Sequence, residues 1–192
     1  MRGDAPRTRD PARKERILTS AAELVARNGF HSVSMADIGT YAGITGPAIY
    51  RHFPSKSAIL VALFDRTIDE LLAEEAHILA THPDLDARLD ALIAAQVRFV
   101  VQDRAIAQVY HHEIRNLPSH DQSRLRRKQR LYVEEWVHVL RELRPGLDDG
   151  TARALIHAAI GAIQSSLFHN VGLTHEREYE LLTKAASAVL HD

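Results

Sequence analysis

The sequence predicts an all-α protein, with a small N-terminal helix-turn-helix bundle followed by a larger helical domain. Apolar residues recur at helical spacing along most of the 192 residues. Polar segments rich in Gly, Pro and Asp interrupt this pattern, and no stretch shows the strict alternation typical of strands. The helices are therefore expected to be separate, short-looped elements that pack against one another.

Composition excludes several classes of site and of location. The chain has no cysteine, which rules out disulfides, thiolate metal sites and a cysteine nucleophile. The N-terminal stretch MRGDAPRTRDPARKER lacks the apolar run of a signal peptide, and no later apolar run is long enough to span a bilayer. We therefore expect a soluble cytoplasmic protein.

The charge is distributed unevenly between the two ends of the chain. Residues 1–56 carry nine Lys and Arg against five Asp and Glu, whereas the remainder carries 15 against 20. A basic N-terminal part on an acidic body is typical of proteins that bind a polyanion such as nucleic acid. A solvated basic tail explains the charge equally well. We expect residues 1–11 to form a basic disordered arm.

Local signals predict three helices within residues 12–56. The first ends at Asn28-Gly29, a helix stop signal. The second begins after Ser34, with Asp37 three residues later in a capping-box position. The third follows Thr45, carries a proline in its first turn and runs to about His52. Two short helices joined by a tight Gly-containing turn form a helix-turn-helix arrangement.

The third helix combines small residues at its start with polar residues at its end. Gly46, Pro47 and Ala48 would allow close approach to base edges in a DNA major groove. We expect Pro47 and Ala48 to contact thymine methyl groups and Arg51 to donate to a base or a phosphate. Tyr50 and His52 also have structural interpretations, because Tyr50 could cover the interface with the first helix and His52 could cap the third.

The run SMADIGTYAGITGPAIYRHFPSKSAIL resembles the helix-turn-helix signature of TetR-type transcriptional repressors. The resemblance covers roughly residues 12–60 and implies an all-helical homodimer of about nine helices that binds an operator and is released by a ligand. It implies that the following residues contact DNA: Ser34, Thr45, Tyr50, His52 and Lys56. Three positions depart from the usual pattern: Gly39, Pro47 and Ala48.

Residues 57–192 are expected to form a ligand-binding and dimerisation domain of five or six helices. The last two predicted helices, at about 149–171 and 174–190, are rich in small residues that permit close helix approach. The resemblance implies that a homodimer forms through residues 149–190. A tight pair within one chain fits the same pattern.

Two Glu-x-x-His motifs raise an alternative from another class. Glu74 with His77, and Glu135 with His138, match the two Glu-x-x-His motifs of a ferritin-like di-iron site, which requires two further single carboxylates. Both motifs lie off the apolar stripes of their helices, whereas bundle metal ligands project inward. No nucleophile elbow or Gly-rich phosphate loop is present. We expect no enzyme, metal or cofactor; a helical protein-binding adaptor is the third possibility.

A ligand pocket in the helical body would need an apolar wall with a few convergent polar groups. The candidates are polar or aromatic residues within apolar runs: Gln96, Tyr110, His111, Glu113, Gln129, Tyr132, Trp136, His157, Gln164, Phe168 and His169.

One segment, VYHHEIRNLPSHDQSRLRRKQRLYVEEW, weakly resembles the corresponding region of family members that respond to acyl-CoA thioesters. Its cations could bind nucleotide phosphates, although a solvated basic helix face is also possible. They are Arg115, Arg124, Arg126, Arg127, Lys128 and Arg130.

Overall fold

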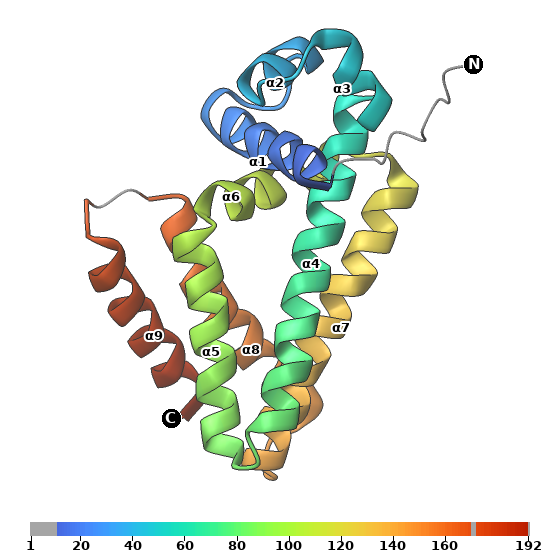
Figure 1. The fold of residues 1–192 in the computed structure, drawn as a ribbon. Helices are drawn as coiled ribbons and strands as arrows, with labels where there is room; N and C mark the ends of the chain where they lie inside the picture. The colour runs from blue at the N-terminus through green and yellow to red at the C-terminus, as the bar shows by residue number, and fades with distance from the viewer. Residues whose placement is uncertain (1–10, 170–171, 192) are drawn as a thin grey trace. The chain divides into compact units, whose positions relative to one another are not determined.

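The structure is a computed structural model that describes residues 11–169 and 172–191. Within these residues the chain forms nine α-helices and two short 3₁₀ segments, with no strand, which confirms the predicted all-α class (Figure 1). Contacts divide the chain into two compact units, Met1–Leu63 and Phe64–Asp192. The division falls inside α4, a few residues after the boundary predicted at 56. The predicted arm, residues 1–11, lies outside the described residues except for Pro11.

The N-terminal unit contains the three helices predicted within residues 12–56 and the start of a fourth. They are α1 (Pro11–Asn28), α2 (Met35–Tyr41), α3 (Gly46–His52) and the first turns of α4 (Lys56–Thr81). Each helix contributes buried apolar side chains to a common core, including Ile17, Ile38, Ile49 and Ile59. This shared core explains how helices of only seven residues persist, since isolated helices of that length are unstable in water.

Specific residues fix the ends of the short helices. At the start of α2, the Asp37 amide donates to Ser34 Oγ at 3.1 Å and the Ser34 amide donates to Asp37 Oδ2 at 2.8 Å, which completes the predicted capping box. After α2, Gly43 adopts φ +67°, a conformation that favours glycine. A Cβ at Gly39 would lie 3.1 Å from the carbonyl oxygen of Ile44, so the turn passes close to α2 there.

The C-terminal unit is a bundle formed by most of α4 and five further helices. Their bounds are α5 (Leu85–Gln102), α6 (Arg104–Glu113), α7 (Ser119–Leu143), α8 (Asp149–Gln164) and α9 (His175–His191), with 3₁₀ segments at Ile114–Asn116 and Ser165–Leu167. The number of helices agrees with the predicted five or six. Trp136 is fully buried at the centre of the core. None of the described helices is both long enough and apolar enough to cross a membrane.

Helix α8 ends earlier than the predicted position of about 171. Ser165 Oγ donates to the Ala162 carbonyl at 2.7 Å, and Ser166 Oγ donates to the Ile163 carbonyl at 3.4 Å. Such bonds to the carbonyl three residues earlier accompany a tightening of the last turn into a 3₁₀ segment. The apolar periodicity continues past this point, which is why the pattern alone overestimated the length of the helix.

Candidate nucleic-acid interface and ligand cavity

One face of α3 is open to solvent and carries polar side chains. Tyr50 is 58% exposed, and Pro47 and Arg51 are also exposed. Neither the Tyr50 hydroxyl nor the Arg51 guanidinium has a hydrogen-bond partner among the described residues, so both groups are available to an external ligand. The opposite face is buried through Ile49 and, at the end of the helix, Phe53.

Ala48 does not belong to this exposed face. Its side chain is only 5% exposed, because it lies next to Ile49 on the surface that packs into the core of the N-terminal unit. The burial corrects the expectation that Ala48 contacts thymine methyl groups. Of the two residues assigned that role, Pro47 alone is exposed.

The capping residues of α2 and α3 differ in how free their hydroxyl groups are. Ser34 Oγ donates to Asp37 Oδ2 at 2.6 Å, so it would have to give up this bond to donate to a phosphate. The hydrogen bonds that the side chain and the backbone amide of Ser34 donate to Asp37 lower the pKa of the Asp37 carboxyl. Thr45 occupies the N-cap position of α3 without a side-chain capping bond and is exposed. Gly46 is exposed as well, whereas His52 is half-buried.

Lys56 has an intramolecular role that the sequence did not indicate. Its ammonium group donates to the carbonyls of Phe30 and Val33, the latter at 2.5 Å, and lies 4.2 Å from the centre of the Phe30 ring. These contacts tie the first residue of α4 to the segment between α1 and α2. The contacts place the charge within the protein, in competition with the predicted phosphate contact.

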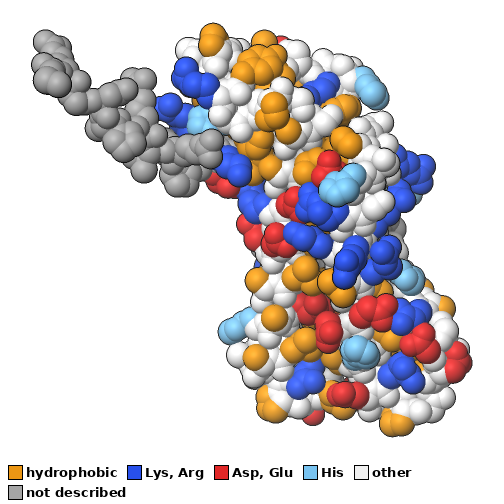
Figure 2. Space-filling view, turned by 90° about the vertical axis from the view of Figure 1, so that its right-hand side faces the viewer, with side chains coloured by type: hydrophobic (Ala, Val, Ile, Leu, Met, Phe, Trp, Pro, Cys, Tyr) orange, Lys and Arg blue, Asp and Glu red, His pale blue; other side chains and the backbone are white. Residues whose placement is uncertain are grey.

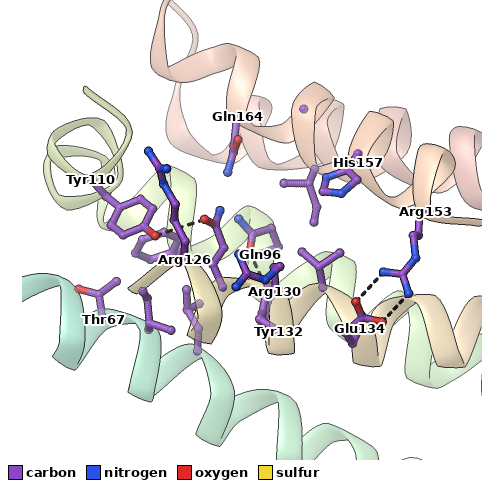
Figure 3. Close-up of a pocket in the computed structure, with 17 residues that line it drawn as sticks. Thr67, Gln96, Tyr110, Arg126, Arg130, Tyr132, Glu134, Arg153, His157 and Gln164 are labelled. Atoms are coloured by element: carbon purple, nitrogen blue, oxygen red, sulfur yellow. Dashed lines mark hydrogen bonds and ion pairs between the residues drawn. The ribbon is translucent and has the colours of Figure 1, made fainter. Parts of the chain in front are cut away.

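The C-terminal unit contains a cavity of about 460 Å³ among α4, α5, α6, α7 and α8. A volume of this size is typical of sites for small organic ligands. Its apolar wall includes Ile68, Leu71, Phe99, Val133 and Ile160. Figure 3 shows Tyr110 and Arg126 at one end, the Glu134–Arg153 pair at the other, and Gln96, Arg130 and Tyr132 between them.

The structure brings six of the eleven candidate ligand residues together in this cavity. These six are Gln96, Tyr110, Gln129, Tyr132, His157 and Gln164. The other five do not line it: His111, Glu113, Trp136, Phe168 and His169. Trp136 is fully buried in the core, and His111 packs edge-on against the exposed ring of Phe168. A polar residue within an apolar run therefore lines the cavity only where its face of the helix also turns toward the cavity.

The polar groups of the cavity are partly bonded to one another. The Tyr132 hydroxyl donates to Gln96 Oε1 at 3.0 Å, and the Tyr110 hydroxyl donates to Gln129 Oε1 at 3.3 Å. Burial raises the pKa of Tyr110 to about 12 and raises that of Tyr132 further. Both phenols are therefore neutral hydrogen-bonding groups at physiological pH.

The basic residues of α7 divide into two sets by their partners. Arg124 and Lys128 bind carboxylates of α4, with Lys128 Nζ 2.9 Å from Asp65 and 2.7 Å from Asp69. Arg126 and Arg130 line the cavity, and neither has an ion-pair partner among the described residues. Figure 2 shows basic and acidic side chains side by side on this face of the molecule.

The far end of the cavity is lined by an ion pair. Both terminal nitrogens of Arg153 donate hydrogen bonds to Glu134, at 2.5 and 2.7 Å, and its Nε donates one to Asp149 at 2.6 Å. The hydrogen bonds from Arg153 lower the pKa of Glu134. Since Arg153 is already matched, the cationic groups left for a ligand are Arg126 and Arg130. Sequence reasoning found neither Arg153 nor Glu134, although the basic segment did include the other two.

The two Glu-x-x-His motifs do not form a metal centre. Glu74 forms an ion pair with Arg98, while His138 Nδ1 lies 3.7 Å from Glu135 of its own motif, with both side chains largely exposed. Throughout the described part of the chain, no group of three His, Asp or Glu side chains is arranged to hold a metal ion.

Comparison with known families assigns both units. The profile described as bacterial regulatory proteins of the tetR family matches residues 17–63, and the profile of the tetracyclin repressor-like C-terminal domain matches residues 82–165. Together they cover more than half of the chain. The first match contains the whole helix-turn-helix, and the second contains most of the cavity lining.

Individual relatives agree with these matches. The HTH-type transcriptional repressor KstR2 of Rhodococcus jostii is 27% identical over 143 residues, which cover 74% of this chain and 69% of that protein. A TetR-family transcriptional regulator from Bordetella parapertussis has the same fold, with a TM-score of 0.86 and 20% identity over 94% of this chain and 95% of that one. The regulator FadR from Bacillus subtilis, solved in complex with stearoyl-CoA, aligns with a TM-score of 0.73 and 21% identity. The alignment covers 92% of this chain and 95% of that one.

Proposed function

Because the chain belongs to the TetR family of bacterial regulatory proteins, we propose that it represses transcription by binding a pseudo-palindromic operator as a homodimer. The observation that carries this proposal is the exposed face of α3. It presents Pro47, Tyr50 and Arg51 on a helix whose other face is fixed in a core. A recognition helix needs one face packed in a core, which fixes its orientation, and exposed hydrogen-bond donors on the other face.

The proposed roles follow from exposure and bonding. Gly46 and Pro47 allow the start of α3 to approach base edges, and Arg51 donates to a base or a phosphate. Tyr50, His52 and Thr45 contact phosphates. Ser34 contributes through the N-terminus of α2 while its hydroxyl remains bonded to Asp37.

The homodimer is proposed to form through α8 and α9. Ala154, Ala158 and Gly161 are exposed and follow one another at spacings of four and three residues, so they share one face of α8; the exposed Ser165 follows in the adjoining 3₁₀ segment. This stripe of small side chains would let a second copy approach closely. Two copies related by a two-fold axis would present two α3 helices to two half-sites.

The effector is proposed to be a small amphipathic anion that occupies the cavity and weakens DNA binding. Its apolar part would lie against Ile68, Leu71 and Phe99, and its anionic group would bind Arg126 and Arg130. An acyl-CoA fits this description, with the acyl chain inside the cavity and the phosphates at the arginines. The stearoyl-CoA complex of FadR, a protein of the same fold, supports this choice of ligand class.

Selection of bound sequences from random double-stranded DNA tests the repressor function. We expect enrichment of a pseudo-palindromic site, and we expect Arg51→Ala to reduce the affinity for that site. Arg141→Ala is the matched control, because Arg141 is an exposed arginine of α7. Equal affinities of the parent and of Arg51→Ala would remove Arg51 from the interface.

Thermal shift with CoA thioesters and with free fatty acids tests the effector. A rise in melting temperature for one of these classes, lost when Arg126 and Arg130 are both replaced by Ala, is the expected result. Binding that is indifferent to both arginines would contradict the proposed anion site while leaving the operator experiment unaffected.

A further inference from the structure

A buried carboxyl group on α4 plays no part in the proposed interface or cavity. Glu75 is 3% exposed, and its Oε1 atom has no hydrogen-bond partner among the residues that the structure describes. It follows Leu71 by four residues and precedes Ile78 by three, so it lies on the apolar stripe of the helix. Burial of a carboxyl group without partners is unfavourable, and such groups concentrate at binding sites.

Glu75 lines a groove of about 600 Å³ between α4 and α7. The residues of this groove are Leu72, Glu75, Ala76, Leu79, Ala80, Leu131 and Glu135. None of them lines the ligand cavity described above. The α4–α7 groove is open to solvent, and Leu131 is 53% exposed at its edge. It is therefore a second hollow with an apolar wall and two carboxyl groups.

The charged side chains around Glu75 leave its carboxyl group uncompensated. On the facing helix, Glu135 is a second acidic group, whose negative charge disfavours ionisation of Glu75, and its own partner is His138 at 3.7 Å. On α5, Arg98 is taken by Glu74 in an ion pair.

Two further polar groups near the groove are also engaged. Arg88 Nε donates to the His82 carbonyl at 3.0 Å, and the Tyr132 hydroxyl donates to Gln96. Burial, together with the charge of Glu135, raises the pKa of Glu75 to about 8. Positive charge is thus what the groove lacks.

We propose that the α4–α7 groove binds a small organic cation, a primary ammonium group on a short apolar chain. The ammonium group would lie against Glu75 and Glu135, and the chain would lie against Leu72, Leu79 and Leu131. An ammonium group supplies three donors, which suits two carboxyl groups that line an otherwise apolar groove. A hard divalent cation is less suitable, because Ca²⁺ and Mg²⁺ need six or more oxygen ligands and the rest of this lining is apolar.

Binding of the cation would release a proton. Glu75 is largely protonated at pH 7, and a nearby positive charge favours its ionised form. The affinity for the amine should therefore increase from pH 6 to pH 8 and level off once Glu75 is ionised in the free protein. An alkylammonium ion keeps its own charge over this range, since amines of the lysine type titrate near pH 10.

Calorimetric titration of the full chain with n-hexylammonium chloride tests the proposal. Experiments at pH 7 in two buffers of different ionisation enthalpy measure the number of protons released. We expect a single saturable site and release of close to one proton per amine bound. Neutral n-hexanol is the reference ligand, because it has the same apolar chain without the charge.

The variant Glu75→Gln and the control Glu70→Gln separate the site from a general charge effect. Both remove one carboxylate from α4, but Glu70 is exposed and outside the groove. The amide resembles the protonated acid that the fold already contains, so Glu75→Gln should fold. We expect it to lose at least about tenfold in affinity and to release no proton, while Glu70→Gln matches the parent.

Three results would overturn the proposal. They are no saturable binding of the amine at millimolar concentration, equal affinities for the amine and for n-hexanol, and an affinity of Glu75→Gln equal to that of the parent. Each concerns the α4–α7 groove alone, so none depends on whether the chain represses transcription.

Discussion

Replacement of Lys56 by Met distinguishes a structural role for this lysine from a direct contact with DNA. Met retains the apolar stem and removes the charge and the donors. In the structure the ammonium group donates to the carbonyls of Phe30 and Val33 and lies 4.2 Å from the Phe30 ring centre. Hydrogen bonds from charged donors contribute about 1.5 to 3 kcal/mol each, and a partly exposed cation over a ring about 0.5 to 1 kcal/mol.

Lys56 is only half-buried, so water would replace part of these interactions in the variant. We therefore expect Lys56→Met to destabilise the protein by about 2 kcal/mol. For a chain of this length that corresponds to a fall in melting temperature of about 4 to 8 °C. Thermal unfolding followed by circular dichroism measures it, with Lys184→Met, at an exposed position of α9, as the control.

The salt dependence of operator binding provides the second measurement on the same variant. Each phosphate contact adds about 0.9 to the slope of log affinity against log salt concentration. If Lys56 acts within the protein, the slope of Lys56→Met stays parallel to that of the parent. An unchanged melting temperature together with a slope reduced by about 0.9 per protomer would refute the reasoning, because it would mean that the ammonium group contacts a phosphate.

Three further predictions follow from the C-terminal unit. The pKa of Glu75 is raised to about 8 in the folded protein, above its ordinary value of 4.5, so the fold binds a proton that the unfolded chain has lost. Stability therefore falls as pH rises from about 5 to 8, by roughly 4 kcal/mol, and Glu75→Gln should remove most of that fall in urea titrations at the two pH values. A fall of the same size in the variant would contradict the assignment. Arg126→Ala and Arg130→Ala should each weaken the binding of an anionic effector by about tenfold, as measured by fluorescence or calorimetric titration. Arg127→Ala, on the same helix but outside the cavity, should leave the affinity within about twofold. Ala158→Glu should convert the proposed dimer to a monomer in light scattering and abolish operator binding; a dimer that survives this change would place the interface elsewhere.

Most of the N-terminal unit was predictable because its signals are local. Ser34 with Asp37, Gly43 and the Phe53-Pro54 stop each act over a few residues, and the structure shows a helix end at each of them. The burial of Ala48 was not predictable in the same way. It depends on the rotation of α3 about its axis, which the packing of three helices determines.

The C-terminal unit shows where periodicity alone is insufficient. Glu75 lies on the apolar stripe of α4, whereas the adjacent Glu74 lies off the stripe and belongs to a Glu-x-x-His motif. The structure reverses their importance, since Glu74 pairs with Arg98 while Glu75 is buried without a partner for its Oε1 among the described residues. A charged residue at a stripe position is thus a stronger signal than a motif on the polar face.

The sequence predicts the types of residue that line the ligand cavity, but it does not predict which individual residues do so. Tyr132 and Trp136 share a helical stripe, but Tyr132 lines the cavity while Trp136 fills the core. Which of two residues one turn apart faces a hollow depends on helices far away in the sequence. Arg126 and Arg130 are four residues apart and share one face of α7, whereas Arg124 and Lys128, each offset by two residues from the nearest of them, share the nearly opposite face.

The central claim is that a two-fold dimer of this chain reads two DNA half-sites through α3. Fluorescence anisotropy with a site selected from random DNA, and with a duplex that contains one half of it, measures this directly. The account predicts that the full site binds at least about a hundredfold more tightly than the half-site, that binding weakens steeply with salt, and that the saturated complex contains two chains. Equal affinities for the full site and the half-site, with one chain per duplex, would contradict it.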